Sequence, residues 1–320
     1  MMRLLIAMVL ACAVYVPVAR SADYPTRPVR FIVPFPPGGA NDIIARLISP
    51  SLTETLGQQF VVDNRGGANT IIGTELTAKA TPDGYTIEIV PGSFAINASL
   101  YKHLPYDTMR DFAPVVMIGN GAYIIVVHPS LPVHSAADLI ALAKKEPGKI
   151  RYGSSGIGNV THLAAELFNS MAGTEMLHVP YKGGGPVMND LLAGRVQVFF
   201  STVSTAAAHV RAGALRAIGA TTAEPSAAFP DVPPVSRTGL PGYVVSGWYG
   251  IIVPAGTPRA VIDTLNRGVR AVVHRPEVKN RLVSLGIDPV DETPEQFGAL
   301  IKSEIGKWGK VVRSLNLKAD

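Results

Sequence analysis

The alternation of strand-like and helix-like stretches is the feature that most constrains how this sequence can fold. The strand-like runs are short and rich in β-branched and aromatic residues, whereas the stretches between them have helical spacing. In the first part of the chain the expected strands are 29–33, 59–62 and 85–90, and the expected helices are 42–56 and 70–79. A βαβαβ order of this kind is typical of a parallel sheet with helices on its faces.

The same order restarts in the middle of the chain. There the expected strands are 123–127, 150–153, 176–179, 196–200 and 215–220, and the expected helices are 136–145, 161–171, 186–193 and 205–211. Prolines and glycines over 229–242 predict an irregular crossing segment, which is followed by a strand over 248–253 and a helix over 258–274. We therefore predict an α/β protein of two lobes, each with a mostly parallel sheet. The first lobe would comprise 23–122 and 247–320, and the second lobe 123–246.

The helix expected over 161–171 has a clear apolar stripe. Leu163, Leu167, Phe168 and Met171 share one of its faces. We expect this face to pack against the core of the second lobe.

The N-terminal segment has the layout of a secretory signal. Met1-Met2-Arg3 gives a positive start, residues 4–18 are almost wholly apolar, and small residues precede Asp23. The apolar run is shorter than the roughly 20 residues that span a bilayer comfortably. We therefore expect residues 1–22 to be a cleaved signal peptide and the protein to be secreted.

Composition excludes several classes of protein for the secreted form. The only cysteine, Cys12, lies inside the expected signal, so disulfides, thiol catalysis and cysteine-based zinc sites are excluded for the secreted form. Loss of Arg3 and Arg20 lowers the formal net charge from +5 to +3. Because the remaining basic residues are scattered, we expect no nucleic-acid partner.

The loop 34–41 connects the first expected strand to its helix. At the carboxyl edge of a parallel sheet such a loop lies where ligands bind, and its glycines let the backbone approach a ligand closely. Free N–H groups at a helix start attract an anion. Asn41 is a candidate helix cap, and Asp42 would complement the positive end of the helix or pair with a ligand ammonium group. A well-formed turn without ligand contact would explain the same residues.

Two further loops precede helices in the second lobe. The loop 153–159 offers two hydroxyls, glycine amides and a helix start near Asn159. It contains Gly156-x-Gly158 but lacks the further glycine and the downstream acid of a dinucleotide fingerprint. The loop 180–185 carries Tyr181, which could cover a ligand, and Lys182, which could pair with a carboxylate or face solvent.

A secreted serine hydrolase is an alternative to a binding protein. Ser154 or Ser155 could act as the nucleophile with His162 as the base. The Gly-x-Ser-x-Gly elbow is absent, and no acid is placed to orient the imidazole. The aspartates and histidines also lack the spacing of a metal site. We therefore expect no catalytic residue, no metal site and no cofactor.

Several short motifs occur along the chain, and their order and spacing together are specific. They are Pro34-Phe35-Pro36-Pro37-Gly38-Gly39 with Asp42 and Arg46, Pro82-Asp83-Gly84-Tyr85, Tyr152-Gly153-Ser154-Ser155-Gly156 with His162-Leu163, His178-Val179-Pro180-Tyr181-Lys182-Gly183, and Trp248-Tyr249-Gly250 with Pro254-Ala255-Gly256-Thr257-Pro258. In these motifs the chain resembles the Bug-type extracytoplasmic solute receptors, the substrate-binding components of tripartite tricarboxylate transporters. The resemblance extends from Tyr24 to the last helix around Trp308.

The resemblance implies a two-lobed periplasmic binding fold of type II, the Venus-flytrap arrangement. It also implies that a small organic acid is held between the lobes, largely by backbone N–H groups, and is delivered in the periplasm to integral membrane transporter subunits. We expect the receptor to be a monomer. A ligand-sensing adaptor for a membrane receptor is an alternative use of the same fold. The ligand-binding positions expected from the loops and the resemblance are Phe35, Pro37, Gly38, Gly39, Ala40, Asn41, Asp42, Ser93, Asn97, Ser154, Ser155, Gly156, Gly158, Asn159 and Tyr181.

The chain departs from the pattern of this family at two places. Gly67-Ala68 is followed by Asn69-Thr70, where two glycines are usual, and the crossing segment carries Arg237, where an acidic residue is common. Neither departure affects the expected fold. Both argue against transferring a particular ligand from a relative.

Overall fold

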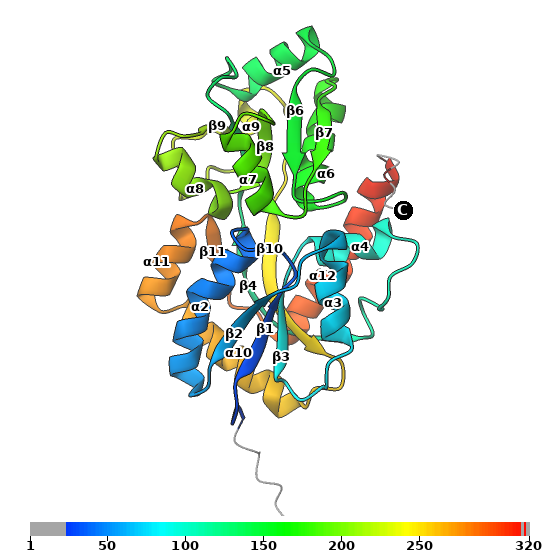
Figure 1. Ribbon diagram of the computed structural model, residues 1–320, viewed down its shortest axis with the longest axis vertical. Helices are drawn as coiled ribbons and strands as arrows, with labels where there is room; N and C mark the ends of the chain where they lie inside the picture. The colour runs from blue at the N-terminus through cyan, green and yellow to red at the C-terminus, as the bar shows by residue number, and fades with distance from the viewer. Residues whose placement is uncertain (1–23, 315–316, 318–320) are drawn as a thin grey trace, which may run out of the picture.

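The computed structural model describes residues 24–314 and 317, so the expected signal peptide, residues 1–22, lies outside the described residues. Within this part the strands form a six-stranded sheet in the order β11-β4-β10-β3-β1-β2 and a five-stranded sheet in the order β7-β6-β8-β5-β9. Figure 1 shows the two sheets in separate lobes, one above the other. The predicted two-lobed α/β class is confirmed.

The first lobe contains the six-stranded sheet. Its strands are β1 (Val29–Val33), β2 (Phe60–Asn64), β3 (Thr86–Pro91), β4 (Phe112–Gly121), β10 (Gly247–Pro254) and β11 (Ile287–Pro289). Its helices are α2 (Ala40–Leu56), the short 3₁₀ helix η1 (Ala68–Thr70), α3 (Ile71–Ala78), α4 (Ser93–Leu100), α10 (Arg259–Val273), α11 (Pro276–Ser284) and α12 (Pro294–Ser314).

The second lobe contains the five-stranded sheet. Its strands are β5 (Tyr123–Val127), β6 (Arg151–Ser154), β7 (Leu177–Pro180), β8 (Val198–Thr202) and β9 (Arg216–Ala220). Its helices are α5 (Ala136–Lys145), α6 (Val160–Ala172), α7 (Gly184–Leu192), α8 (Val203–Arg211) and α9 (Val235–Thr238). The short helix α9 lies inside the segment that the sequence predicted to be irregular.

Both sheets are mixed, so the prediction of mostly parallel sheets is wrong. β1 pairs in parallel with β2 and β3, and β6 pairs in parallel with β7 and β8. β10 runs antiparallel to β3 and β4, β11 runs antiparallel to β4, and β5 runs antiparallel to β8 and β9. The reason lies in the crossings between the lobes: β4 leads the chain out of the first lobe and β10 brings it back, so these neighbours run in opposite directions. Only Ala122 separates β4 from β5.

Helix α2 shows how the apolar pattern of the sequence produces the core of the first lobe. Ile44, Ile48 and Leu52 are spaced four residues apart and are fully buried, so they form one stripe facing the sheet. The helix begins after Gly39, which occupies the cap position that the sequence predicted for Asn41. It ends at Gly57, whose φ of 73° is the left-handed conformation that glycine adopts without strain.

Glu88 is an acidic residue buried inside the first lobe. It lies on β3, its exposed fraction is 0%, and Thr74 Oγ1 donates a hydrogen bond to its Oε1 at 2.8 Å. No ion pair joins it to another residue in the part of the chain described. Burial disfavours the carboxylate form and raises the pKa of Glu88 to about 8.

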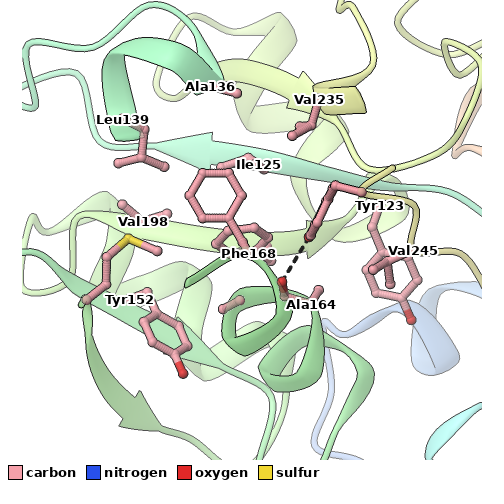
Figure 2. Close-up of a cluster of buried hydrophobic side chains, with 14 of the residues drawn as sticks. Tyr123, Ile125, Ala136, Leu139, Tyr152, Ala164, Phe168, Val198, Val235 and Val245 are labelled. Atoms are coloured by element: carbon pink, nitrogen blue, oxygen red, sulfur yellow. Dashed lines mark hydrogen bonds between the residues drawn. The ribbon is translucent and has the colours of Figure 1, made fainter. Parts of the chain in front are cut away.

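The core of the second lobe is formed by side chains of its strands and helices that pack against one another (Figure 2). Phe168 and Leu163 of α6 are buried in it, as the sequence predicted. Met171, expected on the same stripe, is instead 40% exposed, because it lies at the edge of the helix face that the core covers. Tyr243, which directly follows the crossing segment, donates a hydrogen bond to the carbonyl of Ala164 at 2.9 Å, which satisfies its buried hydroxyl.

Helices of the first lobe also extend to this second core. Trp308 and Val312 of α12 belong to the same buried cluster as the second-lobe residues, as do Ile96 and Leu100 of α4. Figure 1 shows the C-terminal end of α12 at the level of the second lobe. The two lobes are therefore in apolar contact beside the two chain crossings.

Candidate ligand-binding site

Four helices begin at one small cavity between the lobes. They are α2 of the first lobe and α6, α7 and α8 of the second. The cavity has a volume of about 30 Å³ and is lined by Phe35, Gly39, Ala40, Asn41, Pro91, Tyr123, Ser155, Asn159, Thr161, Gly184, Phe199, Thr202, Thr205 and Tyr249. We call it the inner cavity.

No residue lining the inner cavity carries a charged side chain. The first N–H groups of each helix have no partner within the helix, and together they form the positive end of its dipole. Four such ends around one cavity attract an anion without a lysine or arginine.

The loop after β1 forms the first-lobe side of the inner cavity. The first helical hydrogen bond of α2 runs from Ile43 N–H to the carbonyl of Gly39, so the N–H groups of Ala40 and Asn41 precede it. The Asn41 side chain turns away from the helix end and donates to the carbonyl of Ile89 at 3.2 Å. Its predicted capping role is therefore wrong, although Asn41 does line the inner cavity.

Asp42 stabilises this loop through hydrogen bonds. It is 4% exposed, and its carboxylate accepts hydrogen bonds from Gly38 N–H at 3.0 Å, Arg46 Nε at 2.9 Å and Asn64 Nδ2 at 3.0 Å. The described residues lining the inner cavity do not include it. These contacts give Asp42 a clear role in holding the turn at the start of α2.

The loop after β6 forms part of the second-lobe side. Asn159 caps α6, because its Oδ1 accepts a hydrogen bond from Thr161 N–H at 3.1 Å. Several amides of this loop already have partners: Ser155 N–H donates to Thr161 Oγ1 at 2.8 Å, and Gly158 N–H donates to His162 Nδ1 at 3.1 Å. The residues of this loop and of the first turn of α6 that line the inner cavity are Ser155, Asn159 and Thr161.

Ser154 at the end of β6 and two histidines, His162 on α6 and His178 on β7, pack together next to the same loop. Ser154 is fully buried, and its Oγ lies 2.6 Å from His178 Nε2. The rings of His178 and His162 are stacked with their centroids 4.0 Å apart, and the ring of Tyr152 stacks against His178 with a centroid distance of 4.9 Å. Burial lowers the pKa of His162 to about 3, with a smaller effect from His178, and burial lowers the pKa of His178 to about 4.

This arrangement argues against Ser154 and His162 as the catalytic pair of the hydrolase alternative. The histidine beside Ser154 is His178 and not the predicted His162, and the Ser154 hydroxyl also contacts the backbone of Gly156 at 3.3 Å. A nucleophile must be exposed to its substrate, whereas Ser154 is enclosed by its own loop.

The loop before α7 faces the loop before α2 across the lobes. α7 begins at Gly184, two residues before the predicted start, so that Pro186 still lies in the first turn, where no N–H is required. Glycine backbones of the two loops are in contact: a methyl group on Gly185 would lie 2.7 Å from the carbonyl oxygen of Pro37. Pro37, Gly38 and Gly185 also line a separate interlobe cavity of about 290 Å³.

A further cavity of about 240 Å³ adjoins the inner one. Both are lined by Phe35 and Ser155, and the remaining residues of this outer cavity are Gly67, Ala68, Asn69, Thr70, Tyr101, Gly156, Ile157, Pro180, Tyr181 and Lys182. The Tyr181 hydroxyl donates a hydrogen bond to Asp190 at 2.7 Å, which holds its ring in place at the cavity.

Besides Asp42 and Ser154, three of the predicted site residues line none of these three cavities. Ser93 is fully buried, with an unpaired hydroxyl among the described residues. Asn97 is fully buried and its amide is bonded to Asn69 and Thr70. Gly158 packs so closely on Leu100 that any side chain there would clash.

Sequence reasoning missed the start of α8 and three aromatic residues. Thr202 caps α8 through a hydrogen bond from Thr205 N–H, and both threonines line the inner cavity. The Thr-Val-Ser-Thr run after a strand is a recognisable cap signal. Tyr123, Phe199 and Tyr249 lie on strands, and nothing local indicates that their side chains face a cavity.

The described residues hold no group of histidine, cysteine, aspartate or glutamate side chains that could bind a metal ion. No helix within 24–314 combines the length and the apolarity required to cross a bilayer. Two α/β lobes joined by antiparallel crossing strands, with helix starts from both lobes around one cavity, define a solute-binding protein of the periplasmic class.

Comparison with known proteins narrows this class to one family. Residues 44–317 match the family described as "Tripartite tricarboxylate transporter family receptor". The chain is 38% identical to Protein BugT of Bordetella pertussis over 301 residues, which cover 93% of this chain and 92% of that protein. It superposes with a TM-score of 0.89 on periplasmic binding protein BugD, at 31% identity, with 93% of this chain and all of that chain covered. It superposes on the structure of R. palustris Rpa4515 with adipate with a TM-score of 0.90 at 36% identity, and the match covers 92% of this chain and 99% of that chain.

The chain belongs to the tripartite tricarboxylate transporter family of receptors, and the resemblance inferred from its motifs is confirmed.

Proposed function

We propose that this receptor captures a small carboxylate-bearing molecule between its lobes and presents it to the membrane subunits of a tripartite tricarboxylate-type transporter. The observation that carries this proposal is the meeting of four helix N-termini at a cavity with no charged side chain on its wall. A carboxylate suits this site because N–H and hydroxyl donors, together with four dipoles, can stabilise its charge. The solved relative that contains adipate supports the same class of ligand.

The position of the inner cavity implies that the lobes move. Because residues of both lobes line it, the lobes would separate to admit the ligand and close around it. In the closed form one carboxylate would occupy the inner cavity, and the rest of the acid would extend past Phe35 and Ser155 into the outer cavity. The site residues of the sequence prediction would act as walls or as supports of these two spaces.

The lobe boundaries predicted from the sequence, 23–122 with 247–320 and 123–246, suit this motion. The sheet changes between β4 and β5 at Ala122 and again before β10 at Gly247. We infer a hinge at these two crossings. We further propose that the receptor acts as a monomer without catalytic activity, in the periplasm, after removal of the signal peptide.

Calorimetric titration of the purified receptor with malate, adipate and benzoate tests the proposal. We expect heat of binding and a rise in Tm for at least one acid, and a weaker affinity for Thr205→Val, which removes a hydroxyl from the inner cavity. Thr264→Val, on α10 away from both cavities, is the matched control. Absence of heat and of a Tm shift for every acid would contradict the proposal.

A further inference from the structure

A strained turn lies at the edge of the outer cavity. Ala68, Asn69 and Thr70 have φ angles of 45°, 47° and 81°, so three consecutive residues with side chains adopt the left-handed region. Asparagine tolerates this region, whereas a β-branched threonine there is a genuine outlier. Such a conformation persists only where surrounding contacts fix it.

Asn97 provides those contacts from inside the first lobe. Its Nδ2 donates to the carbonyl of Asn69 at 2.7 Å and to Thr70 Oγ1 at 3.2 Å, and its Oδ1 accepts from Asn69 Nδ2 at 2.8 Å. Because Asn97 is fully buried on α4, it anchors the turn to the body of the lobe. The Asn69 side chain is therefore held in one orientation.

This orientation directs Asn69 toward the second lobe. Its Oδ1 lies 3.5 Å from Asn159 Nδ2 and accepts a hydrogen bond from it. The same oxygen lies 3.3 Å from the position that a Cβ would occupy on Gly156, so it also abuts the backbone of the second-lobe loop. Asn159 both caps α6 and lines the inner cavity. One amide thus connects buried Asn97 in the first lobe to the cavity wall in the second.

We propose that Asn69 is a positioning residue that holds the two lobes together in the closed arrangement. The strain of the turn is the cost of placing its amide between Asn97 and Asn159. Closure and ligand affinity are linked, because the ligand binds most tightly to the closed form. The effect on affinity rests on the proposed function, whereas the effect on the lobes does not.

Glycine substitutions separate the amide from the backbone of the turn. Asn69→Gly relieves a positive φ angle and removes the bridge between the lobes. Ala68→Gly, the matched control, relieves a positive φ angle in the same turn without removing a hydrogen bond. Spin labels on Lys79→Cys in the first lobe and Lys144→Cys in the second report the distance between the lobes, since the chain after residue 22 has no cysteine of its own.

We expect longer interlobe distances for Asn69→Gly and wild-type distances for Ala68→Gly. The Tm of Ala68→Gly should be unchanged or higher, and that of Asn69→Gly should be lower than that of Ala68→Gly, because buried Asn97 Oδ1 loses its donor. In adipate titrations Asn69→Gly should bind about fivefold more weakly, the effect of one lost hydrogen bond. Wild-type distances in Asn69→Gly, or an equal lengthening in Ala68→Gly, would overturn the proposal. If no variant binds adipate, the distances still decide the role of Asn69, and only the assignment of this acid fails.

Discussion

Ser154 and His178 share a short contact of 2.6 Å between Oγ and Nε2, which connects the last residue of β6 to the neighbouring strand β7. His162 supports the loop after β6 by accepting a hydrogen bond from Gly158 N–H. Both imidazoles take part in these hydrogen bonds in their neutral form. Because the two rings are stacked, protonation of both would place two positive charges close together, which is unfavourable. The second-lobe half of the ligand site therefore depends on uncharged histidines.

This dependence predicts a loss of stability in acid. The pKa values of about 3 for His162 and about 4 for His178 lie below the value near 6.5 of an unfolded chain. As the pH falls below 6.5, the unfolded state binds protons that the folded state does not, so the free energy of unfolding decreases. His162→Gln can still accept from Gly158 N–H but does not titrate. Relative to the wild type, we expect this variant to gain on the order of 2 kcal/mol between pH 7 and pH 5 in urea unfolding. A difference that does not change with pH would contradict the prediction.

Glu88 gives the free energy of unfolding the opposite pH dependence. Its pKa of about 8 lies above the usual value of 4.5, so the folded state binds a proton that the unfolded state loses as the pH rises from 4.5 to 8. We expect Glu88→Gln to raise the free energy of unfolding by roughly 2–4 kcal/mol at pH 7.5 and by much less at pH 4.5. Thermal unfolding at both pH values checks this. An equal effect at the two values would mean that ionisation of Glu88 does not limit stability.

Phe168 and Met171 offer a comparison on one helix. Phe168 is fully buried in the second core, whereas Met171 is 40% exposed. Phe168→Ala should lower the free energy of unfolding by about 3–5 kcal/mol, because it leaves a cavity, and Met171→Ala should change it by less than about 1 kcal/mol. Urea titration followed by circular dichroism measures both. Similar losses for the two variants would show that α6 packs differently from the arrangement described.

Gly185 tests the contact between the α2 and α7 loops. A methyl group there meets the Pro37 carbonyl at 2.7 Å, so Gly185→Ala should hinder closure of the lobes. Gly306→Ala on α12 is the control, because a methyl group at that position has no atom within 4 Å. Alanine favours helices by about 1 kcal/mol over glycine, so neither variant should lower Tm. Small-angle X-ray scattering should give a larger radius of gyration for Gly185→Ala alone, and unchanged scattering would refute the steric argument.

The sequence predicted well those elements whose apolar pattern is local. Strand β5 and helices α5 and α10 were expected within one residue of their observed bounds, because each has an uninterrupted strand or helix pattern. Strand β4 was missed. It contains Pro114, which weakens a strand pattern, and its pairing with β10 accommodates irregularities in register near that residue.

The site was predictable only in part, for a related reason. The loops before α2 and α6 are visible as glycine-rich links between a strand and a helix, and both do reach the inner cavity. The partner of Ser154 was not predictable, because the parallel register that brings β7 beside β6 places His178 opposite Tyr152 and depends on the whole sheet. The bridge from Asn69 to Asn159 likewise joins residues 90 positions apart.

The uncharged wall of the inner cavity has a consequence for how such receptors diversify. Its anion-attracting groups are largely peptide units at helix ends, which remain when side chains are replaced. In the proposed binding mode, substitutions at Tyr181 and Lys182 of the outer cavity can therefore alter which ligand fits without removing these groups. The proposed binding mode thus assigns recognition of the acidic group and choice among acids to different parts of the chain, and each can change at its own rate.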